Sequence, residues 1–435
     1  MKINPREQEV TPSCSKIICF PPIESADVIT AAARLKEKFE NFKEKKLIRE
    51  VVYEIPGGIL PPGNEGWLKD ISTRSKGADD ELYMKHEELR KHLPRGTTEL
   101  NITKNSVNNS FDYVIHANRK FSGETDDSDS SSSASDFCLE YNFSTTQIIA
   151  MEKINGEAAH FSGRYIDGEF YLIAGSKNVH LIFQNEEHID LYFGERFSIA
   201  IVIARTLLKI WNNLSYENRL LLQNFLHDSK TTVVCEIMLA SRQHVVYFGE
   251  NASNRLIILC LAPPPNEFQK SLTALPTEEV FEIFNALGFE VPNYRILEMD
   301  DLDAHHNEIR QSRGTEGVVY YFENDEGHTI SIVKFKSSWY FHLRALRQQA
   351  TYRYAGSKKN KTNKSFDESK VRSRKRMDEL QEWLYTSTED LNDWKTLSDH
   401  WFDWLEQEVP RGTFPNNMLR DNFPVIWKSF QSSKN

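Results

Sequence analysis

Alternating apolar and polar positions predict several short strands in the middle of the chain. Residues 147–151 form an apolar run and residues 111–116 alternate between apolar and polar side chains, and both patterns are typical of strands. β-Branched and aromatic residues, which favour strands, fill further short segments. These additional predicted strands are residues 169–174, 231–239, 245–247, 256–261, 317–321 and 329–336.

Apolar residues recur at helical spacing in other segments. A helix is predicted for residues 26–46, where Ser25 can cap the first turn and an apolar stripe follows one face. Because helices are inserted between antiparallel hairpins, the pattern indicates an α+β fold and not a doubly wound parallel sheet. The inserted helices are predicted for residues 197–214, 216–226, 277–287 and 300–310.

The C-terminal part of the chain has a helical pattern. Large apolar residues, among them Trp383, Trp394 and Trp401, recur at helical spacing through residues 377–409 and predict a packed helical module. The chain is therefore expected to comprise an N-terminal extension of helix and loop (1–89), a mixed central domain (90–342) and a helical C-terminal module (343–435).

Charge is unevenly distributed along the chain. The 435 residues carry a formal net charge of −10, yet residues 343–376 hold twelve Lys and Arg against Asp367 and Glu368. A local basic surface is sufficient for RNA binding because phosphate contacts dominate nucleic-acid affinity. A solvated connector at the lysine-rich residues 356–364 is the open alternative. Acidic residues and serines fill residues 123–136, which we expect to form a disordered loop.

Cysteine usage and hydropathy describe the expected compartment. The five cysteines lack Cys-x-x-Cys pairing and matching histidine spacing, which fits reduced thiols and argues against a zinc site. The most apolar stretch, residues 197–211, is too short to span a membrane and is interrupted by Arg205 and Lys209. The chain begins with polar residues that lack a signal-peptide core. We therefore expect a cytoplasmic or nuclear protein without a membrane partner.

Residues 151–164, MEKINGEAAHFSGR, contain the main candidate for chemistry. Lys153-Ile154-Asn155-Gly156 follows the predicted strand 147–151, so a turn can hold the lysine amine against a pocket as a nucleophile. The same tetrapeptide also suits a surface hairpin turn, and the segment alone leaves both interpretations open.

Further charged residues stand inside or at the ends of apolar segments. Glu236 lies in Val-Cys-Glu-Ile-Met, Glu316 in Thr-Glu-Gly-Val-Val, and two lysines, Lys334 and Lys336, in Ile-Val-Lys-Phe-Lys. Lys177 stands between the lysine turn and Glu236. A strand with a charge on its buried face usually carries that charge for a ligand, because an unpaired buried charge is costly.

This ordered series resembles the motifs of the covalent nucleotidyltransferases, which are the polynucleotide ligases and messenger-RNA capping enzymes. It is most similar to the RNA ligase branch, which includes phage single-strand RNA ligases and the ligase domain of fungal-type tRNA ligases. The resemblance covers roughly residues 90–350, and Asn155 stands where most relatives have Asp. It implies a nucleotidyltransferase core of antiparallel sheets with helices.

The resemblance also implies a role for each motif residue. Lys153 would attack the α-phosphate of ATP, while Lys334 and Lys336 would neutralise charge on the transferring phosphoryl group together with Mg²⁺ or Mn²⁺. Glu236 would lie on the ribose side and Glu316 on the metal side, and either carboxylate suits ligation of magnesium. The remaining nucleotide-binding candidates are Glu152 beside the adenine, Arg164 and Lys177 at the phosphates, and Arg95 and Lys120 at the triphosphate tail. Salt bridges are the alternative for Arg164 and Lys177, and surface turns for Arg95 and Lys120.

The implied activity is that of an ATP-dependent RNA ligase, which joins a 5′-phosphate and a 3′-OH end through lysyl-AMP and adenylated RNA. RNA repair or tRNA splicing would supply such ends, for example as tRNA halves, and the 3′-end could carry a 2′-phosphate. No kinase or phosphodiesterase domain is joined to the motifs, so separate end-healing enzymes would prepare the RNA. Two alternatives stay open: a GTP-dependent guanylyltransferase of the capping type, and a nucleotidyltransferase-like RNA-binding protein without catalysis.

Overall fold

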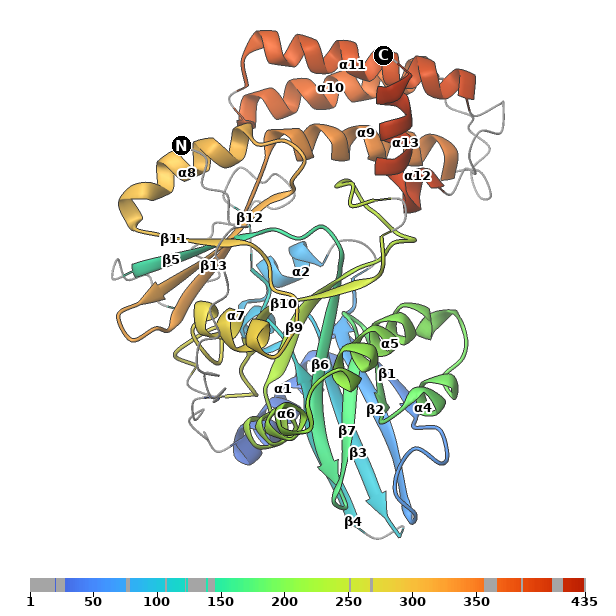
Figure 1. Ribbon diagram of the computed structural model, residues 1–435, viewed down its shortest axis with the longest axis vertical. Coiled ribbons are helices and arrows are strands. Elements are labelled where there is room, and N and C mark those ends of the chain that lie inside the picture. The colour runs from blue at the N-terminus through green and yellow to red at the C-terminus, as the bar shows by residue number, and fades with distance from the viewer. Residues whose placement is uncertain are drawn as a thin grey trace.

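The computed structural model describes residues 20, 28–75, 79–105, 108–121, 123, 138–139, 145–249, 252–266, 269–355, 366–384, 386–408 and 418–433. These residues form three antiparallel sheets with helices packed on them, and a group of helices lies at one end of the molecule (Figure 1). The expected α+β fold, with antiparallel sheets and a helical C-terminal module, is confirmed.

A five-stranded sheet with the order β10-β9-β6-β7-β8 lies in the middle of the molecule (Figure 1). Helices α5 and α6 contact β7 and β6, and strands of a second sheet contact β6, β8 and β9. Contacts on both faces explain why every residue of β8 is buried. The elements are β6 (Glu157–Ile166), β7 (Glu169–Ser176), β8 (Val179–Phe183), α4 (Glu186–Asp190), α5 (Ser198–Asn212), α6 (Tyr216–Ser229), β9 (Thr232–Met238), β10 (Arg255–Ala262) and α7 (Thr277–Ala286).

The second sheet has the order β1-β2-β3-β4 and shares a core with the central sheet. Two of its strands lie within residues 1–89, so the expectation of helix and loop alone in that part is wrong. The strand pattern of β1 is weak because charged residues interrupt the apolar ones in its sequence, IREVVYE. The elements are α1 (Val28–Glu44), β1 (Ile48–Glu54), β2 (Asn64–Thr73), α2 (Asp80–Lys85), α3 (Glu87–His92), β3 (Thr97–Lys104) and β4 (Asn108–His116).

The third sheet has the order β11-β5-β12-β13 and carries the candidate lysines. Its strand β5 ends directly before Lys153, and the β12–β13 hairpin ends at Lys336. Helix α8 packs on β12 and β13. The elements are β5 (Thr145–Glu152), β11 (Tyr294–Leu297), α8 (Leu302–Gln311), β12 (Gly317–Asn324) and β13 (Thr329–Lys336).

The C-terminal helices form their own hydrophobic core at the top of Figure 1. Trp401 is fully buried there and packs edge-on against Trp427 and Phe430. Val245, from the loop that follows β9, is buried in the same core. None of the described helices has the length and hydrophobicity needed to cross a membrane. The helices are α9 (Ser338–Ala355), α10 (Phe366–Leu384), α11 (Thr388–Glu408), α12 (Met418–Asp421) and α13 (Phe423–Ser432).

One predicted strand is wrong, and two predicted segments lie wholly or mostly outside the described residues. Residues 245–247 form a loop and not a strand. Apart from Gly123, the expected acidic loop 123–136 lies outside the described residues, as does the lysine-rich connector 356–364. The other predicted strands and helices are found, with ends that differ by a few residues.

Candidate active site

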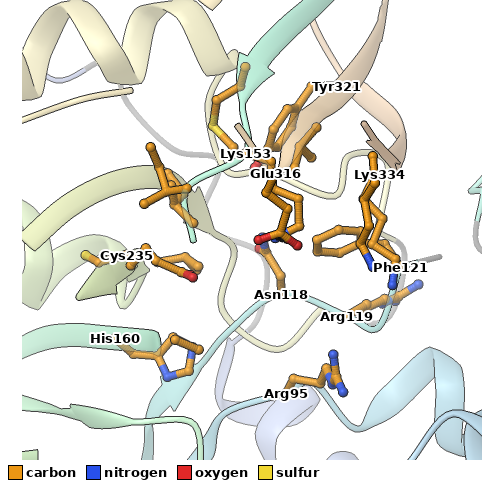
Figure 2. A pocket seen from close by; sticks show the side chains of 18 residues that line it. Arg95, Asn118, Arg119, Phe121, Lys153, His160, Cys235, Glu316, Tyr321 and Lys334 are labelled. Carbon is orange, nitrogen blue, oxygen red and sulfur yellow. Dashed lines mark ion pairs between the residues drawn. The ribbon is translucent and has the colours of Figure 1, made fainter. Parts of the chain in front are cut away.

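A cavity of about 290 Å³ lies between the central sheet and the sheet that contains β5. Residues of β5, β12 and β13 line one side, and residues of β6, β9 and β10 line the other. Figure 2 shows Lys153, Glu316 and Lys334 in the upper part of this view and Arg95 and Arg119 below them. Six residues expected from the motifs line the cavity together: Arg95, Lys153, Glu236, Glu316, Lys334 and Lys336.

Strand register places the three lysines on one wall. The N–H of Lys153 donates to the carbonyl of Gly317 at 2.9 Å, and Gly317 pairs with Lys336 on the next strand. Gly317 has a φ of +140°, and a Cβ there would lie 2.1 Å from the carbonyl oxygen of Phe335. Only glycine therefore fits at position 317, between the strand end at Lys153 and β13. Lys334 faces the same way because it lies two residues earlier on β13.

Glu316 holds the amine of Lys153 and is itself buried. Lys153 Nζ lies 3.0 Å from its Oε1, and Asn155 Nδ2 donates to its Oε2 at 2.5 Å. Burial alone would raise the pKa of Glu316, but the charges of Lys153 and Lys336 and the hydrogen bonds from Lys153 and Asn155 lower it. The carboxylate is therefore ionised at neutral pH, and its charge favours the ammonium form of Lys153.

Asn155 fixes the turn that follows Lys153. Its Oδ1 accepts hydrogen bonds from the N–H groups of Val245 and Val246, both at 3.0 Å. An amide can accept on one side and donate to Glu316 on the other, whereas an ionised Asp could only accept. This dual contact gives a physical reason for asparagine at position 155.

Glu236 approaches the same turn from β9. The N–H of Gly156 donates to its Oε1 at 3.0 Å, and a Cβ at Gly156 would lie 2.4 Å from the carbonyl oxygen of Ile237. Burial raises the pKa of Glu236 to about 7. The positive charge of Lys153 lowers this pKa, and the negative charge of Glu316 raises it further. The cavity thus holds one ionised carboxylate and one carboxyl group that titrates near neutral pH.

Two aspartates that the sequence analysis did not consider organise the remaining candidate cations. Asp79, which precedes α2, accepts hydrogen bonds from Arg95 at 3.1 and 2.5 Å and lies 2.7 Å from Lys177 Nζ. Asp80 lies 2.5 Å from Lys120 Nζ. Arg95 lines the cavity, but Lys120 and Lys177 do not. Lys120 and Lys177 thus form ion pairs at the edge of the site, and their contacts with phosphates stay predictions.

Arg119 occupies the cavity in place of its neighbour Lys120. Adjacent residues of an extended segment point to opposite sides, so one basic residue faces the cavity and the other faces Asp80. Burial lowers the pKa of Arg119 to about 10, and the guanidinium stays charged at neutral pH. No carboxylate in the described part of the chain pairs with it.

Two further candidates, Arg164 and Glu152, do not line the cavity, and their side chains have other partners. Arg164 is 4% exposed, its Nε donates to Asp112 at 2.7 Å, and its Nη groups donate to Ser162 and three main-chain carbonyls. Its donors are used to fix β6 against its neighbours. Glu152 points to the opposite face of β5 from Lys153 and accepts a hydrogen bond from Asn293 at 2.8 Å.

His160 is a cavity residue that the sequence analysis missed. Its Nδ1 lies 3.3 Å from Nε2 of His180, whose Nδ1 lies 3.2 Å from Asp70. Burial lowers the pKa of His160 well below its ordinary value, so the ring is neutral at pH 7. A Cβ at Gly96 would lie 2.4 Å from this ring, which shows how closely the turn after Arg95 packs on it. The available signal was a histidine within each of two apolar strands.

The carboxylates fit a metal ion that arrives with a nucleotide better than a resident one. Among the described residues, no group of three or more His, Cys, Asp or Glu could hold a metal ion. Nucleotide-bound magnesium needs only one or two carboxylates in addition to phosphates and water. Glu316 and Glu236 line the cavity and provide that number.

Comparison with known proteins gives one family and several distantly similar structures. An archaeal ATP-dependent RNA ligase is 11% identical, with a TM-score of 0.47 and coverage of 86% of this chain and 78% of that chain. An apo structure of a Naegleria gruberi RNA ligase mutant is 10% identical, with a TM-score of 0.30 and coverage of 68% of this chain and 97% of that chain. A second mutant of that ligase, with ATP and Mn, is 11% identical, with a TM-score of 0.30 and coverage of 68% of this chain and 96% of that chain. No curated protein matches the chain significantly. The family described as a domain of unknown function, DUF7920, matches residues 71–347. Because this match spans more than half of the chain, the protein belongs to the DUF7920 family.

Proposed function

We propose that this protein is an ATP-dependent RNA ligase that works through lysyl-AMP. The observation that carries the proposal is the convergence of Lys153, Glu236, Glu316, Lys334 and Lys336 on one cavity, although they are far apart in sequence. A lysine amine, two carboxylates and two further cations are the groups that nucleotidyl transfer to lysine requires.

Lys153 is the nucleophile in this proposal. Its Nζ lone pair forms a bond to the α-phosphorus of ATP, the bond from that phosphorus to the bridging oxygen breaks, and pyrophosphate leaves. The amine must first release a proton to water, and its ion pair with Glu316 at 3.0 Å opposes that release. Movement of Glu316 toward a cation that accompanies ATP would remove this opposition. Repulsion from the nearby Lys334 and Lys336 would favour the neutral amine.

The cavity walls offer separate surfaces to the base and to the phosphates. Apolar side chains of Met151, Val234 and Leu259 suit the faces of a purine. Arg95 and Arg119 line the cavity and provide cations for the phosphate tail. Mg²⁺ or Mn²⁺ bound with ATP would supply further positive charge there, with Glu316 and Glu236 as its available protein ligands.

The RNA substrate would carry a 5′-phosphate on one strand and a 3′-OH on the other. After lysyl-AMP forms, the 5′-phosphate oxygen attacks the AMP phosphorus and releases Lys153. The 3′-hydroxyl then attacks the activated 5′-phosphate, and AMP leaves as the phosphodiester forms. tRNA halves and other cleaved RNAs, prepared by separate end-healing enzymes, have the required ends.

The first experiment is incubation with α-labelled ATP or GTP and Mg²⁺, followed by denaturing electrophoresis. We expect ATP to leave an acid-labile label on the protein and Lys153→Ala to remove it. Lys104→Ala is a matched control, because Lys104 also stands at a strand end and pairs with a carboxylate, Asp167, at 2.7 Å. Labelling by GTP alone would favour a guanylyltransferase. The absence of label from both nucleotides would contradict the proposal and favour a binding protein without catalysis.

A further inference from the structure

A second, smaller pocket lies beside the cavity, between α1, α3 and the segment that follows β10. Its volume is about 40 Å³, and Arg119 lines both it and the larger cavity. One water molecule needs roughly 10–15 Å³ of such space. The pocket can therefore accept a group of several heavy atoms but not a nucleobase.

The charged side chains that line the small pocket are cations. Arg34 and Lys38 come from α1, Lys91 from α3, and Arg119 from the segment after β4. No acidic residue is among the described residues that line it. Four cations from three separate elements thus converge on one small space.

Exposed carboxylates pair with the two lysines of the pocket. Lys38 lies 3.3 Å from Glu88, and Lys91 pairs with Glu87 at 2.5 Å. Both carboxylate side chains are about 60% exposed and lie outside the pocket lining. Pairs of this kind contribute little and are weakened by solvent. Arg119, which pairs with no described carboxylate, adds an uncompensated charge.

Burial and the charges of nearby cations hold two histidines in the lining in their neutral form. His92 Nε2 lies 2.8 Å from Lys38 Nζ, so it accepts, and its Nδ1 donates to the carbonyl of Glu88 at 2.8 Å. Burial lowers the pKa of His116 to about 4, and the charge of Arg119 adds to the effect. The surrounding groups therefore create a positive potential, which an anion would relieve.

Arg119 gives the second, independent indication of an anionic ligand. Its guanidinium lies where the pocket meets the cavity, without a described counter-charge, and a partly buried charge of this kind is costly unless an anion binds. The planar guanidinium matches the oxygens of a phosphate group, and charge-assisted hydrogen bonds of this kind are strong.

We propose that the small pocket formed by Arg34, Lys38, Lys91 and Arg119 binds a terminal phosphate of the RNA to be sealed. The assignment rests on the proposed ligase function, because that function makes RNA the substrate. Arg119 joins the pocket to the cavity, so an RNA end held here lies next to the site of AMP transfer. A 5′-phosphate and a 2′-phosphate share this chemistry, and the experiment separates them.

The test variant is Lys38→Ala/Lys91→Ala, which removes two pocket cations and leaves the cavity residues intact. The matched control is Lys43→Ala/Lys85→Ala on α1 and the neighbouring α2. These lysines also pair with carboxylates, Glu50 and Glu81, and lie outside the pocket. Anisotropy would measure the binding of three fluorescent RNAs that differ in carrying a 5′-phosphate, a 2′-phosphate at the 3′-end, or hydroxyls at both ends.

We expect the wild-type protein and the control variant to bind one phosphorylated RNA more tightly than the hydroxyl RNA. In the Lys38→Ala/Lys91→Ala protein, the ratio of the two affinities should fall by about tenfold, because contacts with the phosphate are lost. Its lysyl-AMP formation should stay unchanged. Retention of the preference would overturn the proposal. If the variant lost both lysyl-AMP formation and the RNA preference, the proposal would also be overturned, because the pocket would then serve ATP. A wild-type protein that lacks lysyl-AMP but shows the preference would refute the ligase function and support the phosphate pocket.

Discussion

Replacement of Asn155 by Ala would disconnect three parts of the candidate active site at once. The amide donates to Glu316 at 2.5 Å and accepts the N–H groups of Val245 and Val246 at 3.0 Å. Asn155 is 7% exposed, so these hydrogen bonds are protected from water. Its loss would remove the link between the nucleophile turn, the acidic residue that holds Lys153, and the loop 245–246.

The expected loss of stability follows from the two stranded N–H groups. A buried polar group without a partner costs about 1–3 kcal/mol. Val245 is 2% exposed and would carry the full cost, whereas Val246 is partly exposed and can bind water. We therefore expect Asn155→Ala to lower the free energy of unfolding by about 2–4 kcal/mol. A misplaced Glu316 should also slow lysyl-AMP formation by about 10²-fold.

Urea denaturation and single-turnover labelling with ATP would measure the two effects separately. Asn293→Ala is the control, because Asn293 also donates to a glutamate, Glu152, but on the exposed face of the same sheet. The reasoning is refuted if Asn155→Ala and Asn293→Ala are equally stable and equally active.

Asn155→Asp gives a second test with a distinct pH signature. It keeps the acceptor for the two N–H groups but places a carboxylate oxygen against Glu316. Two carboxylates at that distance cannot both ionise, so the pKa of one rises above its value in the unfolded chain. The folded variant then retains a proton that the unfolded chain releases, and its stability falls as pH rises from about 4 toward 7. A stability difference from wild type that does not vary with pH would contradict this account.

Three further predictions follow from the cavity. Lys334→Ala should reduce lysyl-AMP formation by about 10²–10³-fold without unfolding the protein, and a near-wild-type rate in labelling assays would remove it from the reaction. Burial raises the pKa of Glu236 to about 7 in the folded state, so the folded chain binds more protons than the unfolded chain. The stability of the protein should therefore fall as the pH rises from about 4.5 through 7. The difference amounts to at most about 3 kcal/mol; thermal unfolding across this range should show the slope, and Glu236→Gln should remove it. Gly317→Ala should destabilise the protein and block labelling, because the new Cβ would meet the carbonyl of Phe335 at 2.1 Å; unchanged melting and labelling would contradict the strand register.

Residues next to apolar strands could be recognised from sequence because the strand signal is local. Lys153, Glu316 and Lys334 lie at the ends or inside of segments whose β-branched residues predict strands, and the structure brings all three to one cavity. Their mutual contacts, by contrast, depend on the pairing of strands far apart in sequence. That pairing is not encoded in any local pattern.

Competition for charged side chains decides where several of the candidate residues lie. Arg164 looks like a phosphate ligand in sequence, but Asp112 lies close to it only in the folded protein. Lys120 and Arg119 are adjacent and equally basic, and a single step along an extended segment decides which one faces the cavity. The partner Asp80, which holds Lys120, belongs to a separate helix.

Because Val245 packs in the C-terminal helical core, the turn at Lys153 depends on helices that are synthesised after it. Asn422, beside α13, exchanges hydrogen bonds with the loop at Ser241 and Gln243, and Val245 packs in the core that contains Trp427. The donors that hold Asn155 are thus anchored by a helix that leaves the ribosome long after Lys153. A nascent chain that already contains every motif residue would still lack an organised nucleophile. Under the proposed function, self-adenylation would begin only once translation has passed α13, and we expect a chain that ends before α13 to take no label from ATP.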